Sequence, residues 1–206
     1  MRGKVWDCVF RTGMVVAGSA VMGLSIDLLV MAGFGLDPLS LFQAGLSHIF
    51  SISLGRASQI LMLGIMAVLL VIDRKRVGIG SILNSVLVGA FVNLFSVCIP
   101  AGGVERLWIA VLAVIAGFLL MGIGIGTYIS AHLGEAGVDA LMMFLAEKYR
   151  LHVRVVRISL DVALALAGFL MGGRLGWATL VSVLVNGYVI QMTITGWKYL
   201  RKSGGA

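Results

Sequence analysis

Apolar residues run along this chain in six long segments, which short stretches of glycine, proline and charged residues separate. A membrane-spanning α-helix needs roughly 20 mainly apolar residues, and each segment is near that length. The pattern therefore predicts six transmembrane helices, of which the second and fifth are the shortest. They cover residues 12–33, 57–72, 80–99, 107–130, 157–172 and 177–196.

The composition places the chain in the membrane class. Of its 206 residues, 60% are apolar and 12% are charged, whereas soluble domains have roughly 45–50% and 25%. The 16 Lys and Arg against 9 Asp and Glu would suggest a nucleic-acid partner in a soluble chain. Here the basic residues bracket the apolar segments, as the positive-inside rule expects. We therefore expect an all-α, polytopic membrane protein with no nucleic-acid partner.

The distribution of basic residues predicts the orientation in the membrane. With both termini in the cytoplasm, the inner segments hold 13 of the 16 Lys and Arg residues, and only Arg56, Arg106 and Arg174 lie outside. Cytoplasmic loops carry an excess of Lys and Arg in most membrane proteins. We therefore expect both termini to be cytoplasmic.

The chain contains an internal repeat. Residues 17–40 match residues 116–139 at an offset of 99, and the match continues at an offset of 98 once one residue is dropped between Ser47 and Gly55. Positions related in this way are called equivalent below. The pattern predicts a single membrane domain made of two duplicated halves, residues 1–101 and 102–206. Equivalent pairs include Gly18 and Gly117, Met22 and Met121, Gly35 and Gly134, Arg56 and Arg154, Gly78 and Gly176, Ser81 and Thr179, and Gly89 and Gly187.

The number of spans in each half predicts how the halves are related. Three is odd, so the second half enters the membrane from the opposite side and the repeat is inverted. Many secondary transporters have this architecture, with broken helices that meet at the interface between the repeats.

Two further apolar stretches, residues 38–51 and 137–150, lie between the predicted spans. As helices of about 13 residues they are roughly 20 Å long, too short for a hydrocarbon core of about 30 Å. We interpret them as half-helices, either re-entrant or lying flat at the interface. Gly35 and Pro38 break the chain before the first, and Gly134 and Gly137 before the second; proline is favoured in a first helical turn.

Polar residues inside the apolar segments are candidates for a substrate site. Asp27 has no charged neighbour on its own helix, and an ionisable residue inside a span suggests function; the alternative is a carboxylate at the outer interface. Asp161 is four residues after Arg157, which favours a local ion pair. The other candidates near the breaks and inside spans are Ser40, Asn84, Asp139, Asn186 and Gln191.

Each of these candidates has a structural alternative. Backbone amides at the start of a half-helix favour an anion, but Ser40 and Asp139 can also cap their own helices. The amides of Asn84, Asn186 and Gln191 either bond neighbouring helices or line a central cavity. Because the repeat is inverted, we expect Ser40 and Asp139 to approach one cavity lined by Asn84 and Asn186, with Asp27 as its titratable residue. Arg56 and Arg154 are either anchors near the headgroups or attractors of anions at the two mouths of a pathway.

Several kinds of chemistry are not expected. The three histidines are far apart, and the sequence contains no HxxxH, HExxH or CxxC motif, so we predict no metal and no cofactor. No nucleophile, base and orienting group occur together, so we do not expect an enzyme.

Four motifs are found at the two helix breaks and at the start of the third span. They are residues 34–40 (FGLDPLS), 43–47 (QAGLS), 78–84 (GIGSILN) and 134–142 (GEAGVDALM). In these motifs the chain resembles the YczE/YyaS/YitT family of bacterial membrane proteins. The resemblance extends from about residue 18 to residue 187 and implies a multi-pass bacterial inner-membrane protein. Gln43, in the second motif, joins the candidate substrate-binding residues.

Together these features predict a small secondary transporter, or the membrane subunit of a transporter, for a small polar or anionic solute. The alternative is a membrane partner that does not transport and instead organises or regulates another membrane protein. The expected partners are the lipid bilayer, a small-molecule solute, and either a second copy of the chain or an associated membrane subunit.

Overall fold

The computed structural model describes residues 2–99, 104 and 106–203, with the backbone alone for residues 2–5, 183–184 and 201–203. All regular structure in these ranges is helical, which confirms the predicted all-α class. The elements are α1 (Arg2–Ala32), α2 (Pro38–Phe50), α3 (Leu54–Ile72), the short 3-10 helix η1 (Arg74–Arg76), α4 (Ile79–Phe95), α5 (Leu107–Ser130), α6 (Gly137–Tyr149), α7 (Val153–Leu170) and α8 (Trp177–Ser203).

Each predicted segment corresponds to a helix, but several helix ends differ from the prediction. α1 begins ten residues before the apolar segment, at Arg2, and α8 continues to Ser203. Hydropathy marks where a segment becomes apolar, whereas a helix continues for as long as its backbone hydrogen bonds are kept. In the polar first part of α1, for example, Asp7 and Arg11 form an ion pair at 2.9 Å one turn apart.

The helices include several that suit a membrane. Among the described residues, four segments are long and apolar enough to cross one: Trp6–Ala32, Leu54–Ile72, Leu107–Ser130 and Trp177–Leu200. α4 is apolar but shorter, and α7 carries Arg154, Arg157 and Asp161. Large apolar side chains also cover much of the surface; Val71 and Ile79, for example, are 86% and 84% exposed. Such a surface is suited to lipid, and the chain is a multi-pass helical membrane protein.

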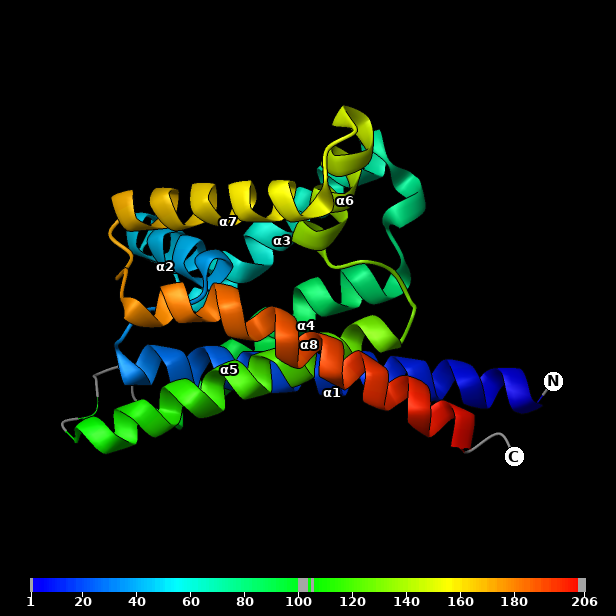
Figure 1. The fold of residues 1–206 in the computed structure, drawn as a ribbon, viewed down its shortest axis with the longest axis horizontal. Helices are drawn as coiled ribbons and strands as arrows, with labels where there is room; N and C mark the ends of the chain where they lie inside the picture. The colour runs from blue at the N-terminus through cyan, green and yellow to red at the C-terminus, as the bar shows by residue number, and fades with distance from the viewer. Residues whose placement is uncertain (1, 100–103, 105, 204–206) are drawn as a thin grey trace.

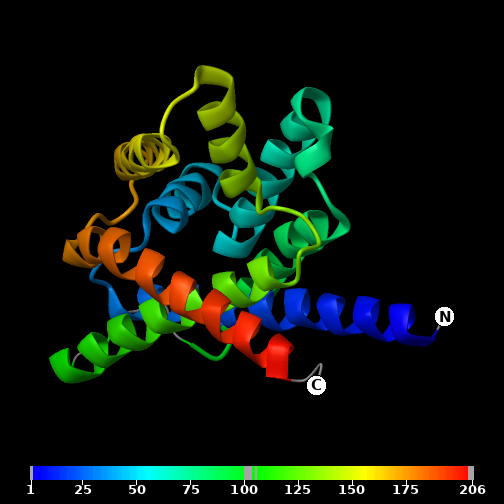
Figure 2. The same cartoon turned by 45° about the vertical axis from the view of Figure 1, so that its right-hand side comes forward.

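Two long helices, α1 and α5, pack against each other along one side of the molecule (Figure 1). α4 packs against α1, and α8 packs against α5. The remaining helices α2, α3, α6 and α7 lie on one side of this group, as Figure 2 shows from a second direction. The beginning of α1 and the end of α8 lie at the same end of the molecule.

Small residues allow α1 and α5 to approach closely. A Cβ atom on Gly18 would lie 2.8 Å from the carbonyl oxygen of Gly124, and one on Gly117 would lie 2.8 Å from the Leu29 side chain. The Ser25 hydroxyl donates a hydrogen bond to Gly117 O at 2.7 Å. Gly18 is equivalent to Gly117, and Ser25 to Gly124. The contact of Gly18 with Gly124 therefore corresponds to the contact of Gly117 with Ser25, with the two halves exchanged.

The two short helices have the same length and end in the same way, but they begin differently. Each has 13 residues and ends at a residue in the left-handed conformation, Ser51 (φ 51°) after α2 and Arg150 (φ 53°) after α6. Pro38 is at the first position of α2, and Asp37 caps it by accepting a hydrogen bond from Ser40 N at 3.2 Å. α6 begins at Gly137 without a side-chain cap. The two predicted short helices are thus confirmed as helices.

Candidate functional site

Each helix break contacts the start of the last long helix of the other half. The carbonyl of Phe34, in the first break, accepts a hydrogen bond from Ala178 N at 3.1 Å. In the second break, Leu133 O accepts one from Gly80 N at 2.9 Å. Leu133 is equivalent to Phe34, and Ala178 to Gly80. The first break is therefore joined to α8 and the second to α4 through equivalent atoms.

Glycine is required at both of these contacts. Gly35 has φ +106° and Gly134 has φ +126°, a region that side chains rarely adopt. A Cβ on Gly35 would lie 2.7 Å from both Gly176 N and Thr179 Oγ1. At Gly134 it would lie 2.7 Å from Gly78 N and would also strike the Ser81 hydroxyl. The two breaks therefore depend on glycine for their conformation and for their close packing.

The candidate polar residues of the first half are buried. Asp27 is 4% exposed, and its Oδ2 atom has no hydrogen-bond partner among the described residues. Gln43 is also buried, and its side-chain oxygen lacks a partner there. Ser40 is buried, and Asn84 accepts a hydrogen bond from the Ser19 hydroxyl at 2.9 Å. Asn84 thus joins α4 to α1, as expected for an amide that bonds a neighbouring helix.

The remaining candidates, which include Arg56 of the first half, are more dispersed. Asn186 is half-buried, and its Oδ1 atom is buried without a partner among the described residues. Gln191 is exposed on α8, and Arg56 and Arg154 are exposed in the first turns of α3 and α7. Asp139 is half-buried in the first turn of α6. The structure does not bring Gln191, Arg56 or Arg154 to the buried polar residues.

Arg157 of α7 links two carboxylates. Its Nη1 atom is 2.9 Å from Asp139 Oδ1, and its Nε atom is 3.1 Å from Asp161 Oδ2. The pairing of Arg157 with Asp161 one turn away was predicted and is confirmed. The contact with Asp139 joins the start of α6 to α7. The Asp139 side chain therefore forms an ion pair and does not cap α6, whose N-cap position is occupied by Ala136.

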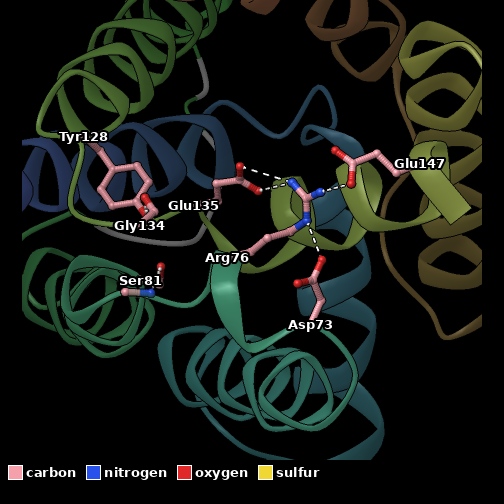
Figure 3. Close-up of polar contacts among 8 residues, drawn as sticks. Asp73, Arg76, Ser81, Tyr128, Gly134, Glu135 and Glu147 are labelled. Atoms are coloured by element: carbon pink, nitrogen blue, oxygen red, sulfur yellow. Dashed lines mark hydrogen bonds and ion pairs between the residues drawn. The ribbon is translucent and has the colours of Figure 1, made fainter.

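A second arginine, which the sequence did not single out, lies among three carboxylates (Figure 3). Arg76 of η1 is 2.8 Å from Asp73, 3.4 Å from Glu135 in the second break, and 2.5 Å from Glu147 near the end of α6. Its side chain is 13% exposed. Beside it, the Tyr128 hydroxyl donates to Gly134 O at 2.9 Å. Arg76 therefore fixes both the second break and α6 to the α3–α4 connection.

The carboxylates around Arg76 hold it in its charged form. The hydrogen bond with Glu147 raises the pKa of Arg76 most, and desolvation opposes this effect. Contacts with Asp73 and Glu135 raise the pKa further. The guanidinium is therefore positive at neutral pH.

A cavity with a volume of about 330 Å³ lies at the first break. Its walls come from α1, α2, the start of α3 and the connection between α7 and α8. The lining residues are Leu29, Val30, Gly33, Gly35, Leu36, Ala44, Ser47, His48, Leu54, Gly172, Gly173 and Arg174. Arg174 is equivalent to Arg76, and it makes no ion pair within the described part of the chain.

A smaller cavity, of about 130 Å³, lies between α2, α7 and the start of α8. Asp161 and Thr179 are in its walls, with Pro38 at the start of α2. The sequence predicted one cavity lined by Ser40, Asn84, Asp139 and Asn186. None of these four residues lines either of the two cavities.

One pair of helices is packed differently in the two halves. α3 and α4 are in close contact where Gly55 faces Gly89, and Gln59 Nε2 donates to Val86 O on α4 at 2.8 Å. In the second half, Gly187 is equivalent to Gly89, but a Cβ there would meet nothing within 4 Å.

In the first half α3 packs against α4, but in the second half the equivalent helix α7 packs mainly against α2 rather than against α8. A Cβ on Gly168 would lie 2.7 Å from the backbone of Leu41 and Phe42, and one on Gly45 would lie 2.7 Å from Met171. Equivalent sequences therefore form a closed α3–α4 contact in one half and leave Gly187 of α8 uncovered in the other.

Comparison with known proteins identifies relatives along nearly the whole chain. It is 29% identical to the uncharacterized membrane protein YczE of Bacillus subtilis over 189 residues, which are 91% of this chain and 87% of YczE. It is 26% identical to an uncharacterized protein of Haemophilus influenzae over 91% of this chain and 85% of the relative. No solved structure matches the chain. A model described as a family of unknown function, DUF6198, matches residues 9–195. Since that model covers most of the chain, this helical membrane protein belongs to the DUF6198 family and is a relative of YczE.

Proposed function

We propose that this protein is a small secondary carrier of the bacterial inner membrane that moves a small polar or anionic solute by alternating access. Its two halves are inverted repeats, and exchange of their conformations opens the pathway first to one side and then to the other. Both termini are cytoplasmic, and α2 and α6 are re-entrant.

The exchanged contacts between the halves support the inverted repeat. Phe34 bonds Ala178 while their equivalents Leu133 and Gly80 bond each other. A two-fold relation predicts this behaviour, since a contact between two positions must recur with the halves exchanged. The α1–α5 interface has the same property at Gly18 and Gly124.

The observation that carries the proposal is the unequal packing of equivalent helices. Gly89 and Gly187 are both near the middle of their predicted spans, residues 80–99 and 177–196. A closed α3–α4 contact in one half and an uncovered α8 in the other are the kind of unequal arrangement that an inverted-repeat carrier exchanges between its two states. Exchange of the two arrangements would give the opposite state.

The buried polar atoms support a pathway through the protein interior. Asp27, Gln43, Thr179 and Asn186 each have a buried oxygen without a partner among the described residues. An unpaired buried polar group costs about 1–3 kcal/mol, so such groups are commonly kept for a function that needs them. Asp27, a carboxylate inside α1, is the candidate for carrying a coupling proton.

The test is uptake by reconstituted protein that can be locked in one state. Arg56→Cys and Leu94→Cys place two exposed thiols on α3 and α4, after Cys8 and Cys98 are replaced by Ser. We expect liposomes with this variant to take up labelled small organic anions, a bifunctional thiol cross-linker to stop uptake, and either single cysteine to be insensitive. A membrane partner that does not transport would give no uptake above empty liposomes. Full uptake after complete cross-linking would contradict alternating access.

A further inference from the structure

We propose that the cavity at the first helix break binds a small organic carboxylate, and that Arg174 is the residue that holds its charge. The inference rests on the proposed function, since it names the class of solute that the carrier takes. In the expected orientation, this cavity is the binding site on the outer side.

The comparison of Arg174 with Arg76 carries the inference. The two arginines are equivalent, each two residues before a glycine that packs on a helix break, Gly176 or Gly78. Arg76 is surrounded by Asp73, Glu135 and Glu147. Arg174 has no carboxylate within ion-pair distance in the described ranges and lines an open cavity. The same position is therefore neutralised in one half and available to an anion in the other.

The equivalents of the three carboxylates explain this difference. Met171 occupies the position equivalent to Asp73, and Leu36 the position equivalent to Glu135. His48 and Glu147 are each the eleventh residue of a 13-residue helix, so His48 stands where the second half has Glu147. Each acidic partner of Arg76 is thus replaced by an uncharged or basic residue around Arg174.

The walls of the cavity suit an anion. None of its lining residues is acidic, and the imidazole of His48 provides a second nitrogen group. The Ser47 hydroxyl is already bonded to Ile52 O at 2.6 Å, so the charged contact falls mainly to Arg174. A guanidinium binds a carboxylate through two parallel hydrogen bonds, which makes arginine the best side chain for this role.

The apolar part of the lining indicates an organic rather than an inorganic anion. The apolar lining residues are Leu29, Val30, Leu36, Ala44 and Leu54, and burial of a hydrocarbon group against them contributes about 0.8 kcal/mol per CH₂. The volume of about 330 Å³ is at the lower end of the roughly 300–1,000 Å³ typical of ligand sites. A short-chain monocarboxylate fits both properties. A phospholipid headgroup also presents an oxyanion, so the experiment includes a short-chain phospholipid as a second ligand.

The test measures binding and uptake separately. Equilibrium dialysis of detergent-purified protein with labelled butyrate at fixed ionic strength should give saturable binding. Arg174→Gln should weaken it about tenfold or more, since a charge-assisted hydrogen bond is lost, and Arg174→Lys should weaken it less. Arg106→Gln, an exposed basic residue also expected on the outer side, is the matched control and should bind as the unmodified protein does.

The outcomes separate this inference from the proposed function. Equal butyrate binding by the unmodified protein and the Arg174→Gln variant, with both monodisperse and equally heat-stable, would overturn the inference. Binding of short-chain phosphatidylglycerol without binding of butyrate would overturn it in favour of a lipid site. Saturable, Arg174-dependent binding without uptake by liposomes would support the site and overturn the carrier. Uptake of butyrate that is unchanged by Arg174→Gln would support the carrier and overturn the site.

Discussion

Phe34 and Ala178 are joined by a backbone hydrogen bond of 3.1 Å, although one follows α1 and the other lies at the start of α8. The bond recurs between their equivalents Leu133 and Gly80 at 2.9 Å. Each half thus holds the broken segment of the other. A movement at one break would therefore displace the last helix of the opposite half, as the proposed alternating access requires.

The breaks should tolerate no side chain at Gly35 or Gly134. Alanine there combines positive φ with a clash against neighbouring backbone, so each substitution should destabilise the protein by about 1–3 kcal/mol or more. Thermal unfolding in detergent measures the loss. Gly64→Ala is the control, since its Cβ would meet nothing within 4 Å, and in a helix it should be neutral or stabilise by up to about 1 kcal/mol. Equal stability of all three variants would contradict the role of the breaks.

Replacement of Arg76 by Gln should destabilise the protein by about 2–3 kcal/mol, since it leaves three carboxylates facing one another. Denaturant unfolding measures this, with the exposed Lys75→Gln as control. The pKa of Arg76 is raised on folding, so its contribution is fully present below its unfolded-state pKa and is lost only at more alkaline pH. Near neutral pH, titration of Arg76 should therefore not contribute to the difference in unfolding free energy between the unmodified protein and the Arg76→Gln variant. A variant as stable as the Lys75→Gln control would contradict the account.

Much of the fold follows from the sequence, because hydropathy and glycine are local signals. The apolar segments mark α1, α3, α4, α5, α7 and α8, and Gly35, Pro38, Gly134 and Gly137 mark the two breaks. Helix ends were less accurate, since polar turns such as that of Asp7 and Arg11 extend a helix beyond its apolar part.

The side-chain contacts were harder to predict. Arg157 was paired correctly with Asp161, which is one turn away, but its contact with Asp139 depends on how α6 lies against α7. The cluster around Arg76 draws its acids from three separate places in the chain. The repeat offset relates Arg76 to Arg174 in the sequence, but it does not reveal that only Arg76 has acidic partners.

Topology can be measured directly with single cysteines. In a background without Cys8 and Cys98, a membrane-impermeant thiol reagent applied to intact cells should label Gly103→Cys and leave Lys75→Cys unlabelled. Residue 103 lies outside the described residues, and the expectation rests on the excess of basic residues in the inner segments. Labelling of position 75 alone would reverse the orientation.

Asp27→Asn should abolish the pH dependence of uptake and leave expression unchanged. The amide keeps the shape of the buried side chain and removes the group proposed to carry a proton. Thermal stability should be equal or higher, since a neutral amide is less costly to bury than a carboxylate. Uptake by proteoliposomes at several pH values checks this, and an unaltered pH profile in the Asn variant would contradict the role of Asp27.

The proposed exchange of conformations between the two halves is tested most directly by two distances, one between α3 and α4 and one between α7 and α8. Spin labels at Arg56 and Leu94 report on α3 and α4, and labels at the equivalent Arg154 and Met192 report on α7 and α8; all four side chains are exposed. Pulsed electron resonance should find the α3–α4 pair short and the α7–α8 pair long in one state. With saturating butyrate, or between acidic and neutral pH, a second population should have the two distributions exchanged. A single, unchanged distribution for both pairs under every condition would contradict the account.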